Sequence, residues 1–409
     1  MNILLINHYA GGPRLGMEYR PYYLAREWQR AGHRVQIVAA SFSHVRARQP
    51  DVGRVALDET IDGVPYRWIP TPRYRGNGAG RAWNIARFLR GVWGAAQQLA
   101  RDFEPDVVIA SSTYPMDIWV ARRVAALARA KLVFEVHDLW PLSPIELSGM
   151  PRWHPFVRLC QWAEDVAYRN ADVVVSMLPK VHQHMAAHGL DLQRLVIVPN
   201  GVATEDWTQP PESLRNDVSV AIAALRSKSR TVIGYAGSMG IPNALDVLLD
   251  AAQTLRAEPI GFVLVGTGHE RERLMHRVAT ENLSQVTIME PIPKAQVRSF
   301  LDRIDIAYIG WRHAPIYRFG IAPNKLIDYM MAGCAVLHSV EAGNDPVAES
   351  GCGLTVAPES AEAVARGLRQ LAGLSAAERR AMGERGREFV LANHSYTVLA
   401  KRFLDAMCR

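Results

Sequence analysis

The sequence predicts an α/β protein built from two doubly wound parallel sheets. Short apolar stretches with the length of buried strands alternate with longer stretches of helical periodicity. This alternation runs through the first half of the 409-residue chain, breaks once and then resumes. Buried strands alternating with helices are typical of parallel sheets covered on both faces, so the two series predict two domains of similar size.

The first series opens with an apolar strand at residues 2–7, and a glycine-containing loop, HYAGGPRLG, follows it. A helix is expected next, at about residues 19–31, and helical stretches separate most of the later strands. The remaining strand candidates are RVQIVAA, PYRWI, DVVIASS, KLVFEV, DVVVSM and RLVIVPN.

The alternation breaks at about residues 204–230, where the polar stretch TEDWTQPPESLRNDV and the basic end RSKSR suggest an interdomain connection. The second series follows with TVIGYAG, GFVLVG, VTIME, DIAYIG and AVLHS. Residues 395–409 have the pattern of an amphipathic helix. We therefore expect domains at 1–205 and 206–394, and a C-terminal helix at 395–409 that can return to the first domain.

Composition narrows the class of protein. The apolar fraction of 49% and the charged fraction of 21% are those of a globular protein. The four cysteines have no CxxC spacing, which fits a reducing compartment and argues against a structural zinc site. The N-terminus lacks the features of a signal peptide, and no apolar run approaches the roughly 20 residues that span a bilayer, so we expect a cytoplasmic protein. The net charge of +7 suits an anionic partner.

The positive charge is concentrated between Gly63 and Arg101, where no acidic residue occurs. Seven arginines fall in this segment together with several aromatic residues. Arginine and tryptophan on one helix are typical of an interfacial membrane helix, although a solvated helix with aromatics in the core gives the same pattern. A second stretch, PRWHPFVRLCQW at residues 151–162, could line an apolar channel or pack in the core. We see no nucleic-acid-binding motif and expect no such partner.

The first glycine loop does not indicate a dinucleotide cofactor. GGPRLG departs from GxGxxG, and the second strand ends in Ala39, Ala40 and Ser41, where an acid should hold the ribose. A Walker A sequence is also missing. Gly11 and Gly12 still allow the backbone to approach a ligand or a facing loop closely, or they mark a tight turn.

The stretch FEVHDLWP ends a buried strand with three titratable side chains. Strand alternation places Glu135 and His137 on one face and Asp138 on the other. A lone histidine at a strand end is often structural. Here it lies where a ligand of the sheet is expected, so His137 is a candidate to hydrogen-bond a sugar or acceptor hydroxyl or to act as a base. Glu135 and Asp138 are candidates to contact the acceptor or to support the histidine.

In the second domain, small residues follow successive strands. Gly237 and Ser238 lie in GYAGSMG, and Gly266 lies in LVGTG. Pro291 and Ile292 follow the next strand in MEPIP, where the prolines would hold backbone groups outward, as suits the edge of a nucleotide base. The order of these signals along one domain predicts a nucleotide site.

The stretch GIAPNKLIDYMMAG places Asn324 and Lys325 at the start of a helix. Leu326, Ile327, Met330 and Met331 share the expected inner face, whereas Lys325, Asp328, Tyr329 and Ala332 share the other. A lysine in the first turn opposes the helix dipole. Either an exposed Lys325–Asp328 ion pair compensates it, or an anion does, bound by the ammonium and the helix N–H groups together. In the second case Lys325 would hold a diphosphate and Asp328 the ribose hydroxyls.

Together these stretches make the chain resemble a family 4 retaining glycosyltransferase of the GT-B fold. The resemblance covers nearly the whole length and rests on LAREWQRAGHRVQIV, FEVHDLWP, VIVPNGV, GYAGSMGIPNALDVLLDAA, LVGTG and PNKLIDYMMAGCAV. It is most similar to bacterial enzymes that build O-antigen, lipopolysaccharide, capsule or other surface glycans. The implied fold has two Rossmann-like domains facing a central cleft.

The resemblance implies that a nucleotide sugar, usually UDP-linked, binds mainly to the second domain and that an acceptor binds to the first. The sugar would be transferred with retention of configuration. No metal or other cofactor would be required, because protein cations and helix dipoles stabilise the leaving diphosphate. A lipid-linked acceptor, for example an undecaprenyl-linked glycan, would place the enzyme peripherally at the inner face of the cytoplasmic membrane. There the segment at 73–101 could dock on anionic lipid.

Individual positions carry over from the family motifs. His137 matches the histidine that contacts the donor sugar, and Asp328 matches the second acid of an E-x7-E motif, which holds the ribose. Ile292 and its neighbours match the backbone contact to the base. Gly11 and Gly12 match the glycine loop beside the diphosphate.

Three positions depart from the family pattern. The first acid of E-x7-E is replaced by Gly320, and the usual arginine and lysine of the second domain are replaced by Ser238 and Ala244. We expect Lys325, helped by Asn324 and the helix N-terminus, to take over the stabilisation of the diphosphate. Two further candidate helpers are Arg312 and Arg318.

Two other functions remain compatible with the sequence. A sugar-nucleotide epimerase of the same architecture would need extra carboxylates around the sugar, and the missing acid at position 320 speaks weakly against it. A catalytically inactive nucleotide-sugar-binding subunit would explain the lost cations. Retention of His137, Lys325 and Asp328 argues against that alternative.

Overall fold

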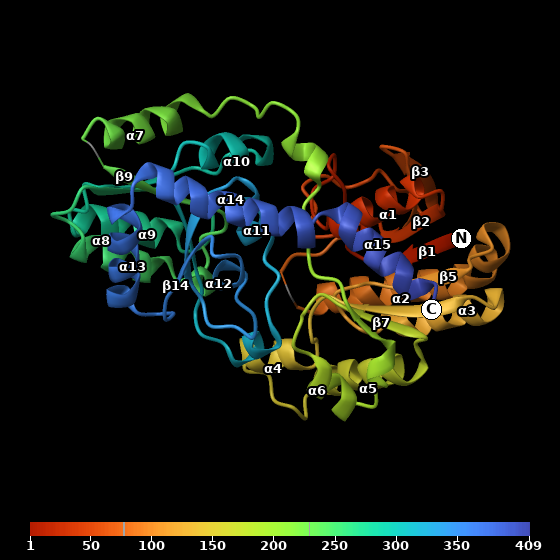
Figure 1. Ribbon diagram of the computed structural model, residues 1–409. Helices are drawn as coiled ribbons and strands as arrows, with labels where there is room; N and C mark the ends of the chain where they lie inside the picture. Colours follow the sequence, from red (N-terminus) through yellow and green to blue (C-terminus); the bar gives the residue numbers. More distant parts are fainter. Residues whose placement is uncertain (77, 229) are drawn as a thin grey trace. The chain divides into compact units, whose positions relative to one another are not determined.

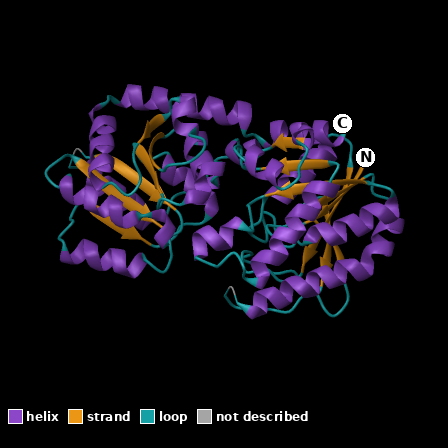
Figure 2. Cartoon of the chain, turned by 90° about the horizontal axis from the view of Figure 1, so that it is seen from below, coloured by secondary structure: helices purple, strands orange, loops and turns teal. Residues whose placement is uncertain are grey.

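The computed structural model describes residues 1–76, 78–228 and 230–409, which divide into two compact units. Unit 1 comprises Met1–Asn200, Phe319–Ile321 and Tyr396–Arg409, and unit 2 comprises Gly201–Arg318 and Ala322–Ser395. Each unit has one β-sheet with helices on both faces (Figure 1; Figure 2). The alternating pattern of the sequence predicts this layered arrangement for both halves of the chain.

The described residues of unit 1 form an eight-stranded sheet in the order β3-β4-β2-β1-β5-β6-β7-β8. All neighbouring strands are parallel except β3 and β4. The strands are β1 (Asn2–Ile6), β2 (Arg34–Ala40), β3 (Leu57–Ile61), β4 (Val64–Ile69), β5 (Val107–Ala110), β6 (Lys131–Val136), β7 (Val173–Ser176) and β8 (Leu195–Ile197).

Strand β3 was not expected from the apolar pattern. Its sequence, LDETI, is exposed at every position but the last, because it lies at the edge of the sheet. It pairs antiparallel with β4 across Asp62 and Gly63, whose φ angles are 48° and 84°. An Asp-Gly pair is the usual signal of a two-residue hairpin, and that signal rather than apolar content marks this strand.

Helices cover the unit 1 sheet, and the last helix of the chain belongs to this unit. It packs on α1: the Trp28 indole N–H donates to the Ala400 carbonyl at 3.2 Å, and the Trp28 ring meets Phe403 edge to face. The helices are α1 (Arg20–Arg30), α2 (Ala79–Phe103), α3 (Asp117–Ala128), α4 (Leu142–Ser148), α5 (Pro155–Asn170), α6 (His182–Ala187) and α15 (Tyr396–Met407), with a 3-10 turn η1 (Leu192–Arg194).

The described residues of unit 2 form a six-stranded, fully parallel sheet in the order β11-β10-β9-β12-β13-β14. The strands are β9 (Thr231–Ala236), β10 (Ile260–Val265), β11 (Val286–Met289), β12 (Ile306–Gly310), β13 (Ala335–Ser339) and β14 (Gly353–Thr355). The first five match the expected apolar stretches. Three-residue β14 is too short to give a periodic signal.

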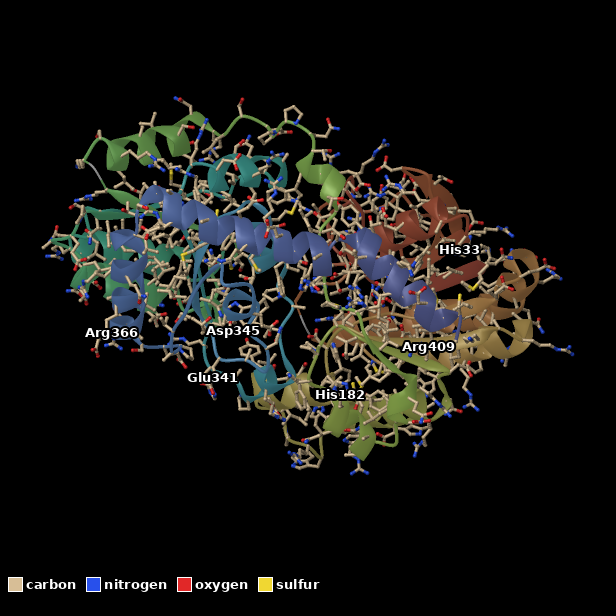
Figure 3. The ribbon with its side chains drawn as sticks, in the orientation of Figure 1. His33, His182, Glu341, Asp345, Arg366 and Arg409 are labelled. Atoms are coloured by element: carbon tan, nitrogen blue, oxygen red, sulfur yellow. The ribbon has the colours of Figure 1, made fainter. Side chains whose placement is uncertain are left out.

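The helices of unit 2 are α7 (Asn216–Arg226), α8 (Leu245–Thr254), α9 (Arg271–Thr280), α10 (Lys294–Leu301), α11 (Asn324–Met331), α12 (Pro346–Ser350), α13 (Ala361–Gly373) and α14 (Ala376–Asn393), with 3-10 turns η2 (Thr204–Trp207), η3 (Ile241–Asn243) and η4 (Pro315–Phe319). Local capping starts several of them. Asp345, labelled in Figure 3, begins α12 by accepting hydrogen bonds from the Val347 and Ala348 N–H groups at 3.2 and 3.1 Å. None of the helices in the described ranges is long and apolar enough to cross a bilayer.

The expected connection at residues 204–230 was wrong for its second half. Helix α7 occupies part of it, and Val218, Ile222 and Leu225 are buried in the same core cluster as Phe300. Their helical spacing follows directly after the proline pair and polar residues that suggested a linker. This segment is therefore part of unit 2 and supports its sheet.

Both sheets change winding direction at an inner strand. β1 lies between β2 and β5, and β9 lies between β10 and β12. At such a point the connections leave toward opposite sides and open a crevice beyond the carboxyl ends of the strands. The candidate residues that follow β1, β6, β9 and β10 lie at these two sheet edges.

Candidate functional site

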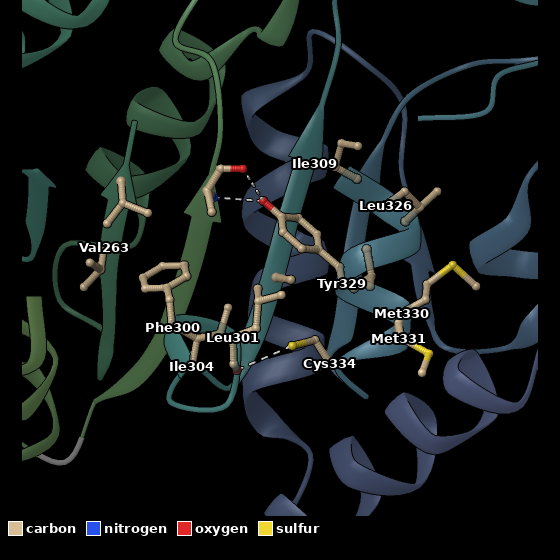
Figure 4. Packing of buried hydrophobic residues seen from close by; sticks show 14 of the residues in the cluster. Val263, Phe300, Leu301, Ile304, Ile309, Leu326, Tyr329, Met330, Met331 and Cys334 are labelled. Atoms are coloured by element: carbon tan, nitrogen blue, oxygen red, sulfur yellow. Dashed lines mark hydrogen bonds between the residues drawn. The ribbon is translucent and has the colours of Figure 1, made fainter. Parts of the chain in front are cut away.

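Helix α11 carries the lysine at the carboxyl edge of the unit 2 sheet. Leu326, Tyr329 and Met330 are each 1% exposed and pack in one core cluster (Figure 4). The Tyr329 hydroxyl accepts a hydrogen bond from the Ala236 N–H at 2.9 Å and donates to the Ala236 carbonyl at 3.2 Å. These two bonds tie the helix to the end of β9. The expectation that Tyr329 lies on the polar face of the helix was wrong.

The ammonium of Lys325 lies close to β9 and η3. Its Nζ donates to the Tyr235 hydroxyl at 2.7 Å and to the Asn243 Oδ1 at 3.1 Å, and it lies 4.1 Å from the centre of the Tyr235 ring. Within the described residues no carboxylate lies within ion-pair distance of this Nζ. The Lys325–Asp328 ion pair, the first of the two explanations for this lysine, therefore does not form.

Burial lowers the pKa of Lys325 from its usual 10.5 to about 7. Two neutral hydrogen-bond acceptors and an aromatic face do not replace the solvation of an ammonium. A bound anion would restore the charged form. The geometry therefore favours the second explanation, an anion held at the mouth of α11.

The side chain of Lys325 leaves no room for a side chain at Gly237. Its φ is 152°, and a Cβ there would lie 2.6 Å from the Lys325 Cε. The N–H of Gly237 donates to Val265, and that of Gly266 donates to Met289, so these glycines bring strand ends together rather than offering N–H groups. Ser238 follows and is exposed. Glycine at position 237 lets the lysine lie directly against the turn.

The Lys325 ammonium lies beside the two positions, Ser238 and Ala244, where this chain lacks the arginine and lysine of the family pattern. Lys325 contacts Gly237 and Asn243, the residues immediately before Ser238 and Ala244. Ala244 is 2% exposed and begins α8. The single ammonium thus lies next to both positions where the family pattern places an arginine and a lysine.

Asp328 lies one turn after Lys325 and is half-buried. Burial, opposed by the Lys294 charge and reinforced by that of Asp206, raises the pKa of its carboxyl to about 6. Its carboxylate has no hydrogen-bond partner among the described residues. A carboxylate without a protein partner is suited to accept hydrogen bonds from two hydroxyl groups of a ligand.

In the turn after β11, the Pro291 carbonyl has a hydrogen-bond partner, whereas Ile292 offers open backbone groups. The Pro291 carbonyl accepts from the Arg215 guanidinium at 3.1 Å. The Ile292 side chain packs against the core, and its backbone N–H and carbonyl have no hydrogen-bond partner among the residues described. Ile292 is therefore suited to meet the edge of a base.

Arg312 and Arg318, the two expected helpers of Lys325, form hydrogen bonds or ion pairs with other residues. Arg312 forms ion pairs with Asp246 at 2.5 Å and Glu359 at 2.9 Å. Arg318 donates to the Pro315 carbonyl at 2.6 Å.

Gly320 has a φ of 97°, a conformation that favours glycine, which gives a backbone reason for the absence of an acid there.

In unit 1 a buried network of polar side chains surrounds His137, just after the carboxyl end of β6. The His137 Nε2 lies 3.2 Å from the Ser111 hydroxyl and 3.3 Å from the Glu135 carboxylate. The Ser111 hydroxyl donates at 2.6 Å to Glu135 Oε2, the same carboxylate oxygen that faces His137. The Arg20 guanidinium donates to Glu135 Oε1 at 2.9 Å and to the carbonyls of Val198 and Pro199.

Neighbouring groups in this network shift the pKa values of Glu135 and His137 toward their charged forms. Burial favours the neutral form of Glu135, but the Arg20 charge and the contacts with His137 and Ser111 together outweigh it and hold the pKa of Glu135 at about 2. Burial also opposes a charge on His137, but the hydrogen bond and negative charge of Glu135 raise the pKa of His137 above its usual 6.5. The histidine is therefore kept protonated more readily than a free one, and it is oriented by a carboxylate that is itself held in place.

The other unit 1 candidates differ in exposure. Asp138 is exposed. The Gly11 N–H donates to the Glu18 carbonyl and the Gly12 N–H to the Gly16 carbonyl, so both are used within their own loop. A Cβ at Gly11 would lie 2.0 Å from the Gly16 carbonyl oxygen. The close approach that glycine allows at position 11 is therefore to the facing part of its own loop.

Sequence reasoning missed three partners of the candidate residues. Arg20, Tyr235 and Asn243 hold Glu135 and Lys325 in place but come from distant parts of the chain. The sequence feature that marks Arg20 is its place beside Pro21 at the start of α1. Its burial, at 1% exposed, is seen in the structure alone.

Comparisons with known proteins agree with these two units. The chain matches a family model described as a glycosyl transferase 4-like domain over residues 16–201, and one described as glycosyl transferases group 1 over residues 230–373. It is 23% identical over 264 residues to WcaI of Escherichia coli (strain K12), which is named as a colanic acid biosynthesis glycosyl transferase. That match covers 61% of this chain and 62% of the relative.

Solved structures of the same fold cover the whole chain. The sucrose-phosphate synthase of Thermosynechococcus elongatus has a TM-score of 0.72 at 17% identity, covering 98% of this chain and 97% of that one. HepE of Anabaena, solved with UDP and glucose, has a TM-score of 0.64 at 13% identity, covering 100% and 99%. WaaG, titled a glycosyltransferase of lipopolysaccharide biosynthesis, has a TM-score of 0.64 at 14% identity, covering 99% of both chains. The chain therefore belongs to the family 4 glycosyltransferases and has the GT-B fold.

Proposed function

We propose that the protein transfers a sugar from a UDP-linked donor to a glycan acceptor in the synthesis of a bacterial surface polysaccharide. The names of WcaI and WaaG support this class of product. The complex of HepE with UDP and glucose supports a nucleotide-sugar donor.

The observation that carries the proposal is the ammonium of Lys325, which has hydrogen bonds but no carboxylate partner in the described chain. In the proposed reaction it neutralises the charge that develops on the leaving diphosphate. A fixed cation at this position stabilises the transition state more than the ground state, because the leaving oxygen gains charge as the sugar bond breaks. Asp328 holds the ribose hydroxyls, and Ile292 meets the base.

In unit 1, His137 donates a hydrogen bond to a hydroxyl of the donor sugar, with Glu135 and Arg20 orienting it. The sugar is transferred with retention of its anomeric configuration. Because the diphosphate is stabilised by the lysine and the start of α11, no metal takes part in the proposed reaction. The acceptor is carried on a lipid, and the protein works at the cytoplasmic face of the membrane.

The experiment is an incubation of the purified protein with UDP-, GDP- and dTDP-sugars, with and without a lipid extract as acceptor. Release of UDP that depends on the acceptor, unchanged by EDTA, supports the proposal. Interconversion of sugar nucleotides without release supports an epimerase instead, and binding without turnover supports an inactive subunit. Either result would overturn the proposed transfer. The anomeric configuration of the product, measured by NMR, tests retention.

A further inference from the structure

A cavity of about 610 Å³ opens on unit 1 between α2, α3 and α5, within the about 300–1,000 Å³ of small-molecule sites. Its walls are three tryptophans, one from each helix: Trp93, Trp119 and Trp162. The Trp119 and Trp162 ring centres are 4.9 Å apart. Aliphatic side chains complete the apolar lining, among them Val120 and Val166.

Three arginines are the charged part of the lining. Arg90, Arg122 and Arg123 line the cavity, and no acidic residue does. The Arg123 guanidinium lies 4.4 Å from the centre of the Trp93 ring, and its Nε is buried without a hydrogen-bond partner in the described chain. None of the three guanidinium groups forms an ion pair with a described carboxylate. The cavity is thus an apolar space flanked by uncompensated positive charge.

Two of the three tryptophans that line the cavity are largely exposed. The side chains of Trp93 and Trp162 are 46% and 58% exposed, on helices whose other large residues are mostly buried. Exposed apolar surface of this extent, next to basic side chains, indicates a binding site rather than a solvated face.

We infer that this cavity binds the apolar chain of an anionic membrane lipid, with Arg90, Arg122 and Arg123 at its phosphate group. Apolar chain and phosphate match the two parts of the lining, since tryptophan faces favour hydrocarbon and guanidinium groups bind phosphate oxygens. The inference deepens the proposed function, because it assigns the lipid contact to a defined place in unit 1. It unites the two stretches that the sequence singled out, 73–101 and 151–162.

The lining argues against a sugar as the occupant. A sugar needs acceptors as well as donors for its hydroxyls, which carboxylates and amides supply. No Asp, Glu, Asn or Gln lines this cavity, and the arginines offer donors only. An anionic amphiphile uses these donors fully, whereas a neutral glycan does not.

The test uses the full chain with vesicles of phosphatidylcholine, alone or mixed with phosphatidylglycerol that has brominated acyl chains. We expect cosedimentation with the mixed vesicles and quenching of tryptophan fluorescence by the bromine. Ala126 lines the cavity and is exposed, so Ala126→Trp fills the space without removing a contact. This variant should bind the mixed vesicles more weakly, because the added indole occupies the space of the acyl chain. Arg123→Gln should bind them about fivefold more weakly, since each lipid-facing arginine adds about 1 kcal/mol.

The matched control is Trp83→Ala, on the same helix α2, where the side chain is 59% exposed but does not line the cavity. It should bind the mixed vesicles like the unmodified protein. Equal loss in the control and in Ala126→Trp would show general adsorption and overturn the inference, as would binding of unmodified protein to pure phosphatidylcholine at equal strength. Displacement by inorganic phosphate alone would also overturn it. No nucleotide sugar is present, so failure here is separate from failure of the proposed transfer.

Discussion

The ammonium of Lys325 rests on the side chain of Tyr235, 2.7 Å from its hydroxyl and 4.1 Å from the centre of its ring. An aromatic face and a hydroxyl attract a cation but add no negative charge. The lysine is thus positioned by neutral groups, and a bound anion would supply the negative charge that these groups lack. The following predictions test this arrangement and the buried network of unit 1.

Replacement of Lys325 by alanine should lower turnover by about 100-fold or more, because a fixed donor to the leaving group is lost. The protein should remain folded, since the lysine has no buried ion pair to break. Steady-state kinetics and thermal melts measure the two effects. Lys228→Ala is the control, because Lys228 is an exposed lysine of the same unit. Turnover that falls equally in both variants would contradict a specific role.

Binding of UDP-glucose should weaken as the pH rises above 7. In the free protein the pKa of Lys325 is about 7, so the amine becomes neutral above that value. The diphosphate stabilises the ammonium, so a complex formed above pH 7 takes up a proton. Calorimetric titrations at several pH values measure this. The Lys325→Arg variant stays charged throughout and should lose the pH dependence; an equal slope in that variant would assign the effect to another group.

Lys325 should also cost stability in the free protein. Its folded pKa lies below its unfolded value of 10.5, so the unfolded chain binds a proton more readily between pH 7 and 10.5. Stability should therefore rise with pH across this window and be constant, from this group, below 7. Lys325→Met should flatten the rise in urea-unfolding experiments. A steeper rise in the variant would show that the lysine is not strained by burial.

Breaking the pair between Arg20 and Glu135 should destabilise unit 1. Both side chains are at most 1% exposed, and Glu135→Gln leaves a buried guanidinium without a charge partner, at a cost of about 3–5 kcal/mol. Urea unfolding measures the change. The matched control is Glu258→Gln, which removes the exposed pair with Arg369 and should cost less than about 1 kcal/mol. Similar losses in both variants would contradict the buried role.

The same pair predicts a response to acid. The folded pKa of Glu135 is about 2, below its unfolded value of 4.5. Its contribution to stability is therefore complete above pH 4.5 and is lost as the pH falls toward 2. The difference in unfolding free energy between the unmodified protein and Glu135→Gln should shrink over this range. A difference that is constant from pH 5 to about 2 would show that the carboxylate is not held ionised.

The Tyr329 hydroxyl should matter both for stability and for catalysis. Tyr329→Phe leaves the Ala236 N–H and carbonyl without their partner, which should cost about 1–3 kcal/mol of unfolding free energy. Because these bonds tie α11 to β9, the variant should also lower kcat/KM. Equilibrium unfolding and kinetics measure the two. Unchanged kcat/KM in a destabilised variant would show that the lysine does not depend on this anchor.

The sequence predicts the strands well because apolar stretches of four to seven residues mark them directly. It misses β3, whose residues are exposed, and it takes α7 for a connection because a proline pair precedes it. Tyr329 was assigned to the wrong face because α11 is covered on more than one side, which a single helical stripe cannot reveal.

The candidate site could also be predicted only in part from the sequence. Lys325, Asp328 and His137 lie in short motifs next to strand ends, so their order along the chain reveals them. Their partners do not share this signal: Tyr235 is 90 residues from Lys325 in sequence and Arg20 is 115 from Glu135. Only the folded chain brings such side chains together. For the same reason the cavity between α2, α3 and α5 could be suspected from its arginines and tryptophans but not located.

The central claim is that Lys325 binds the diphosphate, and the most direct measurement compares the affinities of UDP and uridine in the unmodified protein and in Lys325→Ala. These two ligands differ only in the diphosphate. We predict that the unmodified protein prefers UDP and that the variant loses about tenfold or more of this preference while its affinity for uridine stays the same. An unchanged ratio of the two affinities in the variant would contradict the account.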